Sequence, residues 1–263
     1  MSMRSLWTAA TGMSAQQTNM DVIANNLANA NTTGFKRSRG NFEDVMYQIV
    51  VAPGADTSSS SKVPTGIQIG MGAKTVSVEK LFQQGNFSET DNNLDMAIQG
   101  NGFFKVLRGS QEVYTRAGSF KTDQNGNIVD ASGYTVQPQI TIPQTAVTTH
   151  IDSSGLFTAT DATGKTVLST QMHLYNFQNP AGLQAIGQNY FTSTDSSGEV
   201  IDTPPGGTEG MGTILQGYLE ASNTNVVNEM VNMIMSQRAY EANSKVIKSA
   251  DEMLQIANNV VKS

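Results

Sequence analysis

The residues that could carry out chemistry are few, and their spacing argues against a catalytic or ligand-binding role. The two histidines, His150 and His173, each lie in a strand-like run without a second histidine or a carboxylate at metal-ligand spacing. The segment 70–75, Gly-Met-Gly-Ala-Lys-Thr, resembles a phosphate-binding loop, but Ala73 stands where such a loop requires the glycine before its lysine. Both histidines are therefore predicted to be structural, and no phosphate-binding loop is predicted.

The segment 123–127 has the alternating Asp/Asn spacing of a calcium loop. Ile128 replaces the turn glycine and Tyr134 replaces the bidentate glutamate, so the two most diagnostic positions do not match. Asn125 followed by Gly126, between two alternating runs, is instead a strong signal for a β-hairpin. The sequence therefore predicts no catalytic residue, no cofactor and no metal ligand, and it favours a non-catalytic structural protein.

The composition excludes several classes of partner. Charged residues make up 14% of the 263 residues, against roughly 25% in an ordinary soluble protein, and the formal net charge is -6. Because phosphate binding needs excess positive charge, no nucleic-acid partner is expected. The absence of cysteine removes disulfides, thiolate metal sites and a cysteine nucleophile. Neither membrane insertion nor a cleaved signal peptide is expected, since no apolar run approaches roughly 20 residues and the N-terminus lacks an apolar core.

The N-terminal segment is predicted to be a long amphipathic helix. Its apolar residues recur at steps of three and four over more than three heptads, with one polar member. The seam consists of Met3, Leu6, Ala10, Met13, Gln17, Met20, Ala24 and Leu27. The helix is expected to stop at Gly34, which suits a left-handed C-cap, with Phe35 supplying the apolar contact after it.

The C-terminal segment is predicted to be a second long helix with a broader apolar face. One seam at the same spacing contains Val226, Met230, Met233, Gln237, Tyr240, Ser244, Ile247, Asp251, Leu254, Asn258 and Val261. A second seam beside it runs from Met235 to Val260. Two neighbouring seams are wider than one helical partner can cover, so the face is expected to bind further partners. The alternative is a helical pair that serves only its own subunit.

The sequence between these ends is typical of strands. Short alternating runs bounded by turn residues predict an antiparallel β domain at residues 74–221. Residues 35–73 are expected to form an extended or hairpin connector that includes a polar loop at 52–66. The predicted fold class is α+β, in which residues 1–34 and 222–263 pack as a coiled-coil-like stalk and an all-β domain is inserted between them.

Several segments resemble the bacterial flagellar rod and hook family. The N-terminal signature of that family is matched at residues 24–37, Ala-Asn-Asn-Leu-Ala-Asn-Ala-Asn-Thr-Thr-Gly-Phe-Lys-Arg, and its C-terminal signature at residues 229–247. Two central blocks match as well, at residues 84–104 and 114–120. Because both ends match in the right order, the resemblance covers essentially the whole chain.

Within the family, the chain resembles the rod subunits more than the hook protein. Residues 4–7, residues 42–48 and the polar loop that follows are like one rod subunit in particular. The hook protein generally carries an extra outer domain, for which this chain has no room. The alternatives are another rod or hook subunit, a non-flagellar helical polymer, and a periplasmic carbohydrate-binding or hydrolytic β domain.

The resemblance implies a subunit of the flagellar basal-body rod, a tube that spans the periplasm and acts as the drive shaft between motor and hook. Such subunits leave the cytoplasm through the flagellar type III export apparatus without a cleaved signal peptide. The implied partners are copies of the chain itself, the proximal rod proteins, the hook protein and the surrounding outer-membrane and peptidoglycan ring proteins.

The resemblance also implies that the terminal helices bind neighbouring subunits through head-to-tail contacts. The residues expected to carry this self-assembly are Met3, Leu6, Met13, Met20, Ile23, Leu27, Asn25, Asn26, Asn29, Val226, Met230, Met233, Tyr240, Ile247 and Leu254. The three asparagines are poor helix formers, so their side chains are expected to make specific polar contacts. Pro53, Gly54, Pro64 and Gly66 mark a loop that is expected to become ordered between subunits and to stiffen the tube.

Overall fold

The chain divides into two compact units, each built from segments that are separated in the sequence. The computed structural model describes residues 2–54, 56–58, 61–62, 64–206 and 210–262. Unit 1 consists of the residues up to Ala28, the segment Ser38–Glu79 and the residues from Asn225 onward. Unit 2 consists of Asn29–Arg37 and Lys80–Thr224.

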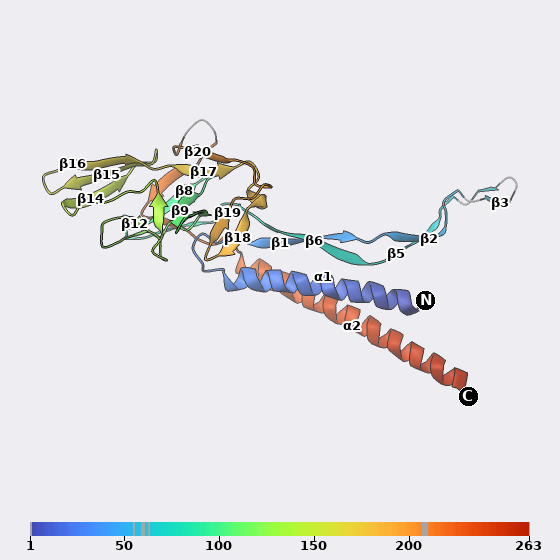
Figure 1. The fold of residues 1–263 in the computed structure, drawn as a ribbon. Helices are drawn as coiled ribbons and strands as arrows, with labels where there is room; N and C mark the ends of the chain where they lie inside the picture. The colour runs from blue at the N-terminus through green and yellow to red at the C-terminus, as the bar shows by residue number, and fades with distance from the viewer. Residues whose placement is uncertain (1, 55, 59–60, 63, 207–209, 263) are drawn as a thin grey trace. The chain divides into compact units, whose positions relative to one another are not determined.

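Unit 1 contains both long helices and a series of two-stranded ribbons (Figure 1). The helices are α1 (Ser2–Ala28) and α2 (Val226–Lys262). The strands are β1 (Ser38–Asp44), β2 (Tyr47–Val51), β3 (Asp56–Ser58), β4 (Ser61–Lys62), β5 (Ile67–Gly70) and β6 (Ala73–Lys80). They pair as β1 with β6, β2 with β5 and β3 with β4. The α2 helix begins where the Asn225 side chain accepts a hydrogen bond from the Asn228 backbone N–H at 3.1 Å, which is an N-cap.

The predicted coiled-coil-like stalk is wrong, although the α+β class fits. The described residues form two α-helices, one near each end, and otherwise mostly strands. The two helices do pack on each other, but the side chains buried along them are mainly small or polar, and only Ala250 among them belongs to a predicted apolar seam. These buried residues are Ala9, Ala15, Ile23, Asn26, Glu229, Ser236 and Ala250.

Polar contacts and small residues explain why the helices pack in this way. The Asn19 side-chain amide donates to the Ser236 hydroxyl at 2.8 Å. A Cβ atom added at Gly12 would lie 2.9 Å from the Asn243 amide nitrogen, so the absence of a side chain there permits the close approach. A heptad pattern marks an apolar stripe on a helix, but it does not specify which surface covers that stripe. Met230, a residue of the predicted seam, stays exposed.

The first helix also ends earlier than expected. It ends at Ala28, six residues before Gly34, so the predicted stop at Gly34 and Phe35 is wrong. Gly34 still needs to be glycine, because its φ is +70° and an added Cβ would lie 2.7 Å from the Ala117 backbone nitrogen. Gly34 and Phe35 are both buried in unit 2.

Unit 2 is built of strands that pair antiparallel. Its elements are β7 (Phe87–Glu89), β8 (Met96–Gln99), β9 (Phe104–Arg108), β10 (Gln111–Thr115), β11 (Lys121–Thr122), β12 (Ile128–Val129), β13 (Thr135–Gln137), β14 (Ala146–Ile151), β15 (Leu156–Asp161), β16 (Thr166–Gln171), β17 (Leu174–Phe177), η1 (Pro180–Gly182), β18 (Gln184–Gly187), β19 (Tyr190–Thr192), β20 (Val200–Thr203), β21 (Thr213–Gln216) and β22 (Tyr218–Glu220). The largest sheet has seven strands in the order β11-β12-β13-β9-β10-β19-β18. Separate sheets are formed by β14-β15-β16 and by the pairs β17-β20, β21-β8 and β22-β7.

The turn between β11 and β12 confirms the predicted hairpin. Gly126 has a φ of +80°, and its N–H donates to the Asp123 carbonyl oxygen at 2.9 Å. The Asn127 side-chain oxygen accepts a hydrogen bond from the Thr141 hydroxyl at 2.7 Å. The residues with calcium-loop spacing thus serve the hairpin and its neighbouring strand.

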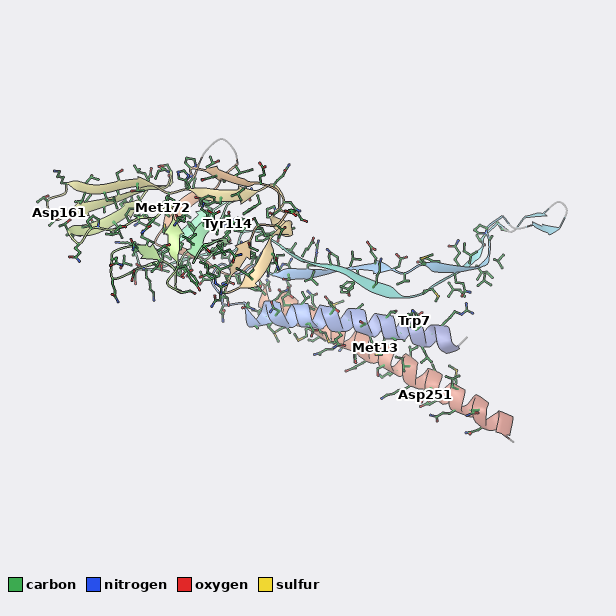
Figure 2. All side chains as sticks on the ribbon, in the orientation of Figure 1. Trp7, Met13, Tyr114, Asp161, Met172 and Asp251 are labelled. Carbon is green, nitrogen blue, oxygen red and sulfur yellow. The ribbon has the colours of Figure 1, made fainter. Side chains whose placement is uncertain are left out.

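The described residues of unit 2 form two clusters of buried apolar side chains. In the larger cluster, the rings of Phe104 and Phe120 meet edge to face at a centroid distance of 5.1 Å. The smaller cluster is mainly aromatic and consists of Phe103, Tyr114, Tyr175, Phe177, Leu183 and Phe191. Figure 2 labels Met172 in the larger cluster and Tyr114 in the smaller one.

A buried ion cluster joins distant segments of unit 2. The Glu220 carboxylate accepts a hydrogen bond from Lys36 Nζ at 2.6 Å and lies 3.5 Å from Arg116 Nη1. The Gly85 backbone N–H also donates to this carboxylate at 2.9 Å. Burial lowers the pKa of Lys36, and the adjacent Glu220 charge opposes that effect. One buried anion therefore balances two buried cations, and its loss would leave both uncompensated.

We expect Glu220→Gln to destabilise unit 2 by about 3–5 kcal/mol, because a neutral amide cannot balance Lys36 and Arg116 in a buried site. The matched control is Glu79→Gln, which removes the partly exposed pair with Arg39 and is expected to cost less than about 1 kcal/mol. Denaturant unfolding followed by circular dichroism measures both. Equal midpoints for the two variants would contradict the expectation.

Tyr114 gives a pH-dependent prediction. Burial, followed by the charge of Glu112, raises the pKa of Tyr114 to about 12, whereas a tyrosine in the unfolded chain titrates near 10. The folded protein therefore holds the Tyr114 proton more tightly than the unfolded chain does. The contribution of this group to the free energy of unfolding is fully present below about pH 10 and is lost as the pH rises toward 12. In Tyr114→Phe, the unfolding free energy should fall less steeply above about pH 10, by up to about 1.4 kcal/mol per pH unit. Urea unfolding at successive alkaline pH values tests this, and parallel curves for both proteins would refute it.

Candidate functional site

The N-terminal half of α2 carries an uncovered apolar row. Val227, Val231 and Ile234 are 69%, 50% and 49% exposed. Their spacing of four and three places them on one helical face, and the exposed residues Met230 and Met235 flank them. We call these five residues the α2 apolar row. By helical periodicity they lie on the opposite side of α2 from its buried residues Glu229 and Ser236.

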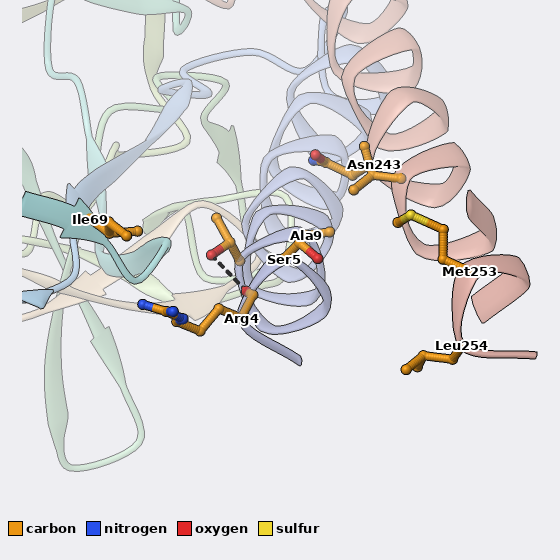
Figure 3. Close-up of a pocket in the computed structure, with 10 residues that line it drawn as sticks. Arg4, Ser5, Ala9, Ile69, Asn243, Met253 and Leu254 are labelled. Atoms are coloured by element: carbon orange, nitrogen blue, oxygen red, sulfur yellow. Dashed lines mark hydrogen bonds between the residues drawn. The ribbon is translucent and has the colours of Figure 1, made fainter. Parts of the chain in front are cut away.

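Unit 1 also contains a groove of about 760 Å³ between α1, β5 and α2 (Figure 3). Ala9 of α1, Ile69 of β5, and Met253 and Leu254 of α2 contribute apolar surface to it. Arg4 lies at the groove and donates to the Gln48 side-chain oxygen at 2.9 Å. The groove therefore extends the uncovered apolar surface of unit 1 beyond the α2 apolar row.

The two-stranded ribbons of unit 1 expose further apolar side chains. Met46, between β1 and β2, is 84% exposed, and on the strands themselves the exposed apolar residues are Phe42, Tyr47, Ile49, Val50, Ile67, Ile69, Val76 and Val78. The sheets β1-β6 and β2-β5 have two strands each, so each strand has an edge outside its own pair. Exposed apolar side chains next to such edges are suited to contact with another chain.

The residues predicted to carry self-assembly differ widely in exposure. Ile23 and Asn26 are buried, and Asn26 exchanges two hydrogen bonds of 2.8 Å with the Ser38 backbone. The half-buried residues are Leu6, Met13, Met20, Leu27, Asn29, Met233 and Ile247. The exposed ones are Asn25, Val226, Met230, Tyr240 and Leu254. Met3 belongs to α1, but its side chain lies outside the described part of the chain.

The polar loop predicted at 52–66 contains a short strand pair. β3 and β4 pair antiparallel, with Asp56 opposite Lys62. Pro53, Gly54 and Pro64 are exposed, and Gly66 is half-buried. Ala55, Ser59, Ser60 and Val63, which also belong to the predicted loop, lie outside the described residues.

A small polar pocket of about 190 Å³ in unit 2 contains the carboxylate of Asp130. The carboxylate accepts hydrogen bonds from the backbone N–H groups of Ser132 and Tyr134 at 2.9 and 3.0 Å, and from the Tyr190 hydroxyl. These contacts secure a turn and a neighbouring strand, which accounts for the carboxylate by structure alone. The pocket therefore does not favour a hydrolytic or carbohydrate-binding domain.

The described part of the chain offers neither a metal site nor a helix that could span a membrane. No group of three or more His, Cys, Asp or Glu side chains in that part of the chain could hold a metal ion. No helix within it is both long and apolar enough to cross a membrane. His173 instead pairs with Asp202 at 2.7 Å on an exposed surface of unit 2.

Sequence reasoning missed the ion cluster of Lys36, Arg116 and Glu220. Lys36 and Arg116 lie within the segments that carry the family resemblance, but nothing local indicates that their charges are buried. Glu220 lies outside those segments, 184 residues from Lys36. No periodicity or spacing could have paired them, because the pairing depends on the tertiary fold.

Three family models match different parts of the chain. The model described as "Flagella basal body rod protein" matches residues 6–36, and "Flagellar hook protein FlgE/F/G D1 domain" matches residues 97–159. "Flagellar basal body rod FlgEFG protein C-terminal" matches residues 215–260. The matches fall in the same order as the N-terminal, central and C-terminal segments of the resemblance.

Relatives of nearly the same length share almost half of their residues with this chain. Three of them are named "Flagellar basal-body rod protein FlgG". The protein from Buchnera aphidicola subsp. Schizaphis graminum is 49% identical, over 95% of this chain and 97% of its own. The Caulobacter vibrioides protein is 48% identical over 98% and 99% of the two chains, and the Borreliella burgdorferi protein is 46% identical over 98% of each. The chain therefore belongs to the flagellar basal-body rod family, as a structural subunit of the distal rod.

Proposed function

We propose that this subunit polymerises with copies of itself into a rigid helical tube that transmits torque from the motor to the hook and conducts exported subunits. The observation that carries the proposal is the α2 apolar row, an exposed stripe on a helix whose opposite side already packs on α1. The family membership supplies the context of a rod.

The apolar row could supply substantial assembly energy. Complete burial of each large aliphatic side chain, such as Val227, Val231 or Ile234, contributes about 1.5–3 kcal/mol. In a tube the contacts are head to tail, so the apolar row of one subunit meets a different surface of the next and the contact repeats without closing. Met230 and Met235 are flexible side chains that can adapt to such a neighbour.

The low charge of the chain suits this arrangement. Only 14% of its residues are charged, and its net charge is -6. Identical subunits in a polymer bring identical charges close together, and like charges that are partly removed from water repel more strongly than charges in bulk solvent. A sparsely charged surface reduces that repulsion.

The partners and location belong to the same proposal. Rod subunits of this kind would contact the proximal rod on one side and the hook protein on the other, inside the ring proteins of the outer membrane and peptidoglycan. The tube would span the periplasm, and its subunits would arrive through the type III export apparatus without a cleaved signal peptide. A structural subunit of this kind would need no catalytic site.

The segment 52–66 is proposed to stiffen the tube. Pro53 and Pro64 have restricted backbone angles, and the β3-β4 pair gives the segment its own backbone hydrogen bonds. A hairpin of this kind can extend to a neighbouring subunit and fix the angle between the two. Pro53, Gly54, Pro64 and Gly66 delimit the segment to be removed in a test.

Ile234→Asp tests the role of the apolar row. The charged side chain cannot be buried against a neighbour, so we expect polymerisation to weaken at least about tenfold. The fold of the subunit should survive, because Ile234 is half exposed in the subunit itself. Sedimentation and electron microscopy measure assembly, and circular dichroism measures folding.

Asn232→Asp is the matched control for Ile234→Asp. It adds the same charge two residues away, at an exposed position that lies outside the arc of the apolar row by helical periodicity. We expect this variant to polymerise normally. Normal polymers from Ile234→Asp, or equal loss in both variants, would show that the apolar row does not drive assembly.

Removal of residues 52–66 tests the stiffening role. We expect polymers of the shortened chain to form but to bend more, because the proposed link between neighbouring subunits is missing. Electron micrographs give the bending stiffness from the curvature of the polymers. A second variant, with the segment replaced by a Gly/Ser linker of equal length, separates the effect of sequence from that of length. Unchanged stiffness in both variants would refute the role.

A further inference from the structure

The chain passes between unit 1 and unit 2 four times, and residues near three of these crossings are bound to one another within unit 2. The crossings follow Ala28, Arg37, Glu79 and Thr224. Four separate single-stranded links would be flexible, since each could change its backbone angles independently. Hydrogen bonds between the links determine whether they move independently or together as one body.

Asn223 binds two of the other links directly. Its side-chain oxygen accepts a hydrogen bond from the Arg37 backbone N–H at 2.8 Å. Its side-chain nitrogen donates to the carbonyl oxygens of Leu81 and Gln83 at 2.8 and 3.1 Å. The Leu81 N–H also donates to the Arg37 carbonyl oxygen at 2.9 Å, so the two segments that Asn223 binds are bonded to each other as well. We call Asn223 and these backbone groups of Arg37, Leu81 and Gln83 the crossing clamp.

Glu220 binds the segment between the first and second crossings. The Gly34 N–H donates to its backbone oxygen at 2.7 Å, which holds the segment that follows the first crossing. Its carboxylate binds Lys36 at 2.6 Å in the buried ion cluster. Glu220 and Asn223 thus bind residues near the second and third crossings, and both lie just before the fourth.

We infer that the crossing clamp bears torque within unit 2, because it holds the unit 2 ends of three links together so that they respond as one body. This inference rests on the proposed function, because only a subunit of a drive shaft carries such load. Asparagine suits the position, since its side chain offers one acceptor oxygen and two donor hydrogens and the clamp uses all three. Aspartate has the same shape but no donors, so it breaks two of the three side-chain bonds.

The first test is amide hydrogen exchange on the purified full-length chain carrying Asn223→Asp or Asn223→Ala. We expect exchange at Arg37 to accelerate about tenfold in Asn223→Ala, which removes the acceptor of its N–H, and less in Asn223→Asp, which keeps an acceptor oxygen. Exchange at Leu81 should accelerate in both variants, because its carbonyl loses the Asn223 donor and the segment loosens. Exchange in β9 and β10 should not change, which separates local loosening from a general loss of stability. Asn93→Ala, at an exposed position of unit 2, is the control and should leave both regions unaltered.

The second test measures torsional stiffness in cells whose rods contain the same variants. With the motor stalled, a bead attached to the hook should show larger angular fluctuations for Asn223→Asp than for Asn93→Ala. Unchanged amide exchange at Arg37 and Leu81 would overturn the clamp, and faster exchange with unchanged bead fluctuations would overturn its role in bearing torque. Absence of the unaltered chain from isolated rods would instead overturn the proposed function itself, and with it the source of the load.

Discussion

The packing of α1 on α2 through small and polar side chains is the constraint on which the properties of unit 1 depend. The hydrogen bond between Asn19 and Ser236 and the close approach of Gly12 to Asn243 set the rotation of each helix about its axis. With that rotation set, the apolar stripe of α2 cannot turn toward α1. A pair of helices packed through their apolar stripes would bury those stripes against each other. This pair instead leaves Val227, Met230 and Ile234 exposed in the subunit.

Unit 2 follows the opposite principle, because its large apolar side chains are mostly buried within the unit itself. Phe104 and Phe120 lie in one buried cluster, and Tyr114 lies in the other. The ion cluster around Glu220 adds a strict geometric requirement, since two buried cations must meet one carboxylate. Unit 2 thus buries most of its large apolar side chains itself, with a few such as Val147 exposed, whereas unit 1 leaves a continuous apolar row on α2 uncovered. This difference suits a polymer in which one part of each subunit folds on its own core and another part forms the contacts between subunits.

Three of the four segments that carry the family resemblance meet at Glu220, although they are far apart in the sequence. Lys36 comes from the N-terminal signature, while Gly85 and Arg116 come from the two central blocks, and all three bind the Glu220 carboxylate or lie beside it. Gly34 belongs to the same arrangement, because its left-handed backbone passes against the backbone of Ala117. These motif residues are therefore explained by the internal architecture of unit 2 and need no ligand to account for them.

The sequence by itself determined the features that depend on neighbours along the chain. Helical periodicity predicted both terminal helices, and Asn125-Gly126 predicted the β11-β12 hairpin, because capping, periodicity and turn geometry are local properties. The tertiary structure decided which surfaces those elements use. An apolar residue such as Met230 indicates a surface that favours burial, but it does not indicate which surface covers it. The two helices pack through Asn19, Ser236 and Gly12 and not through Met230. It also decided the pairing of Lys36 with Glu220, since a carboxylate 184 residues away becomes a neighbour only when the strands between them have folded.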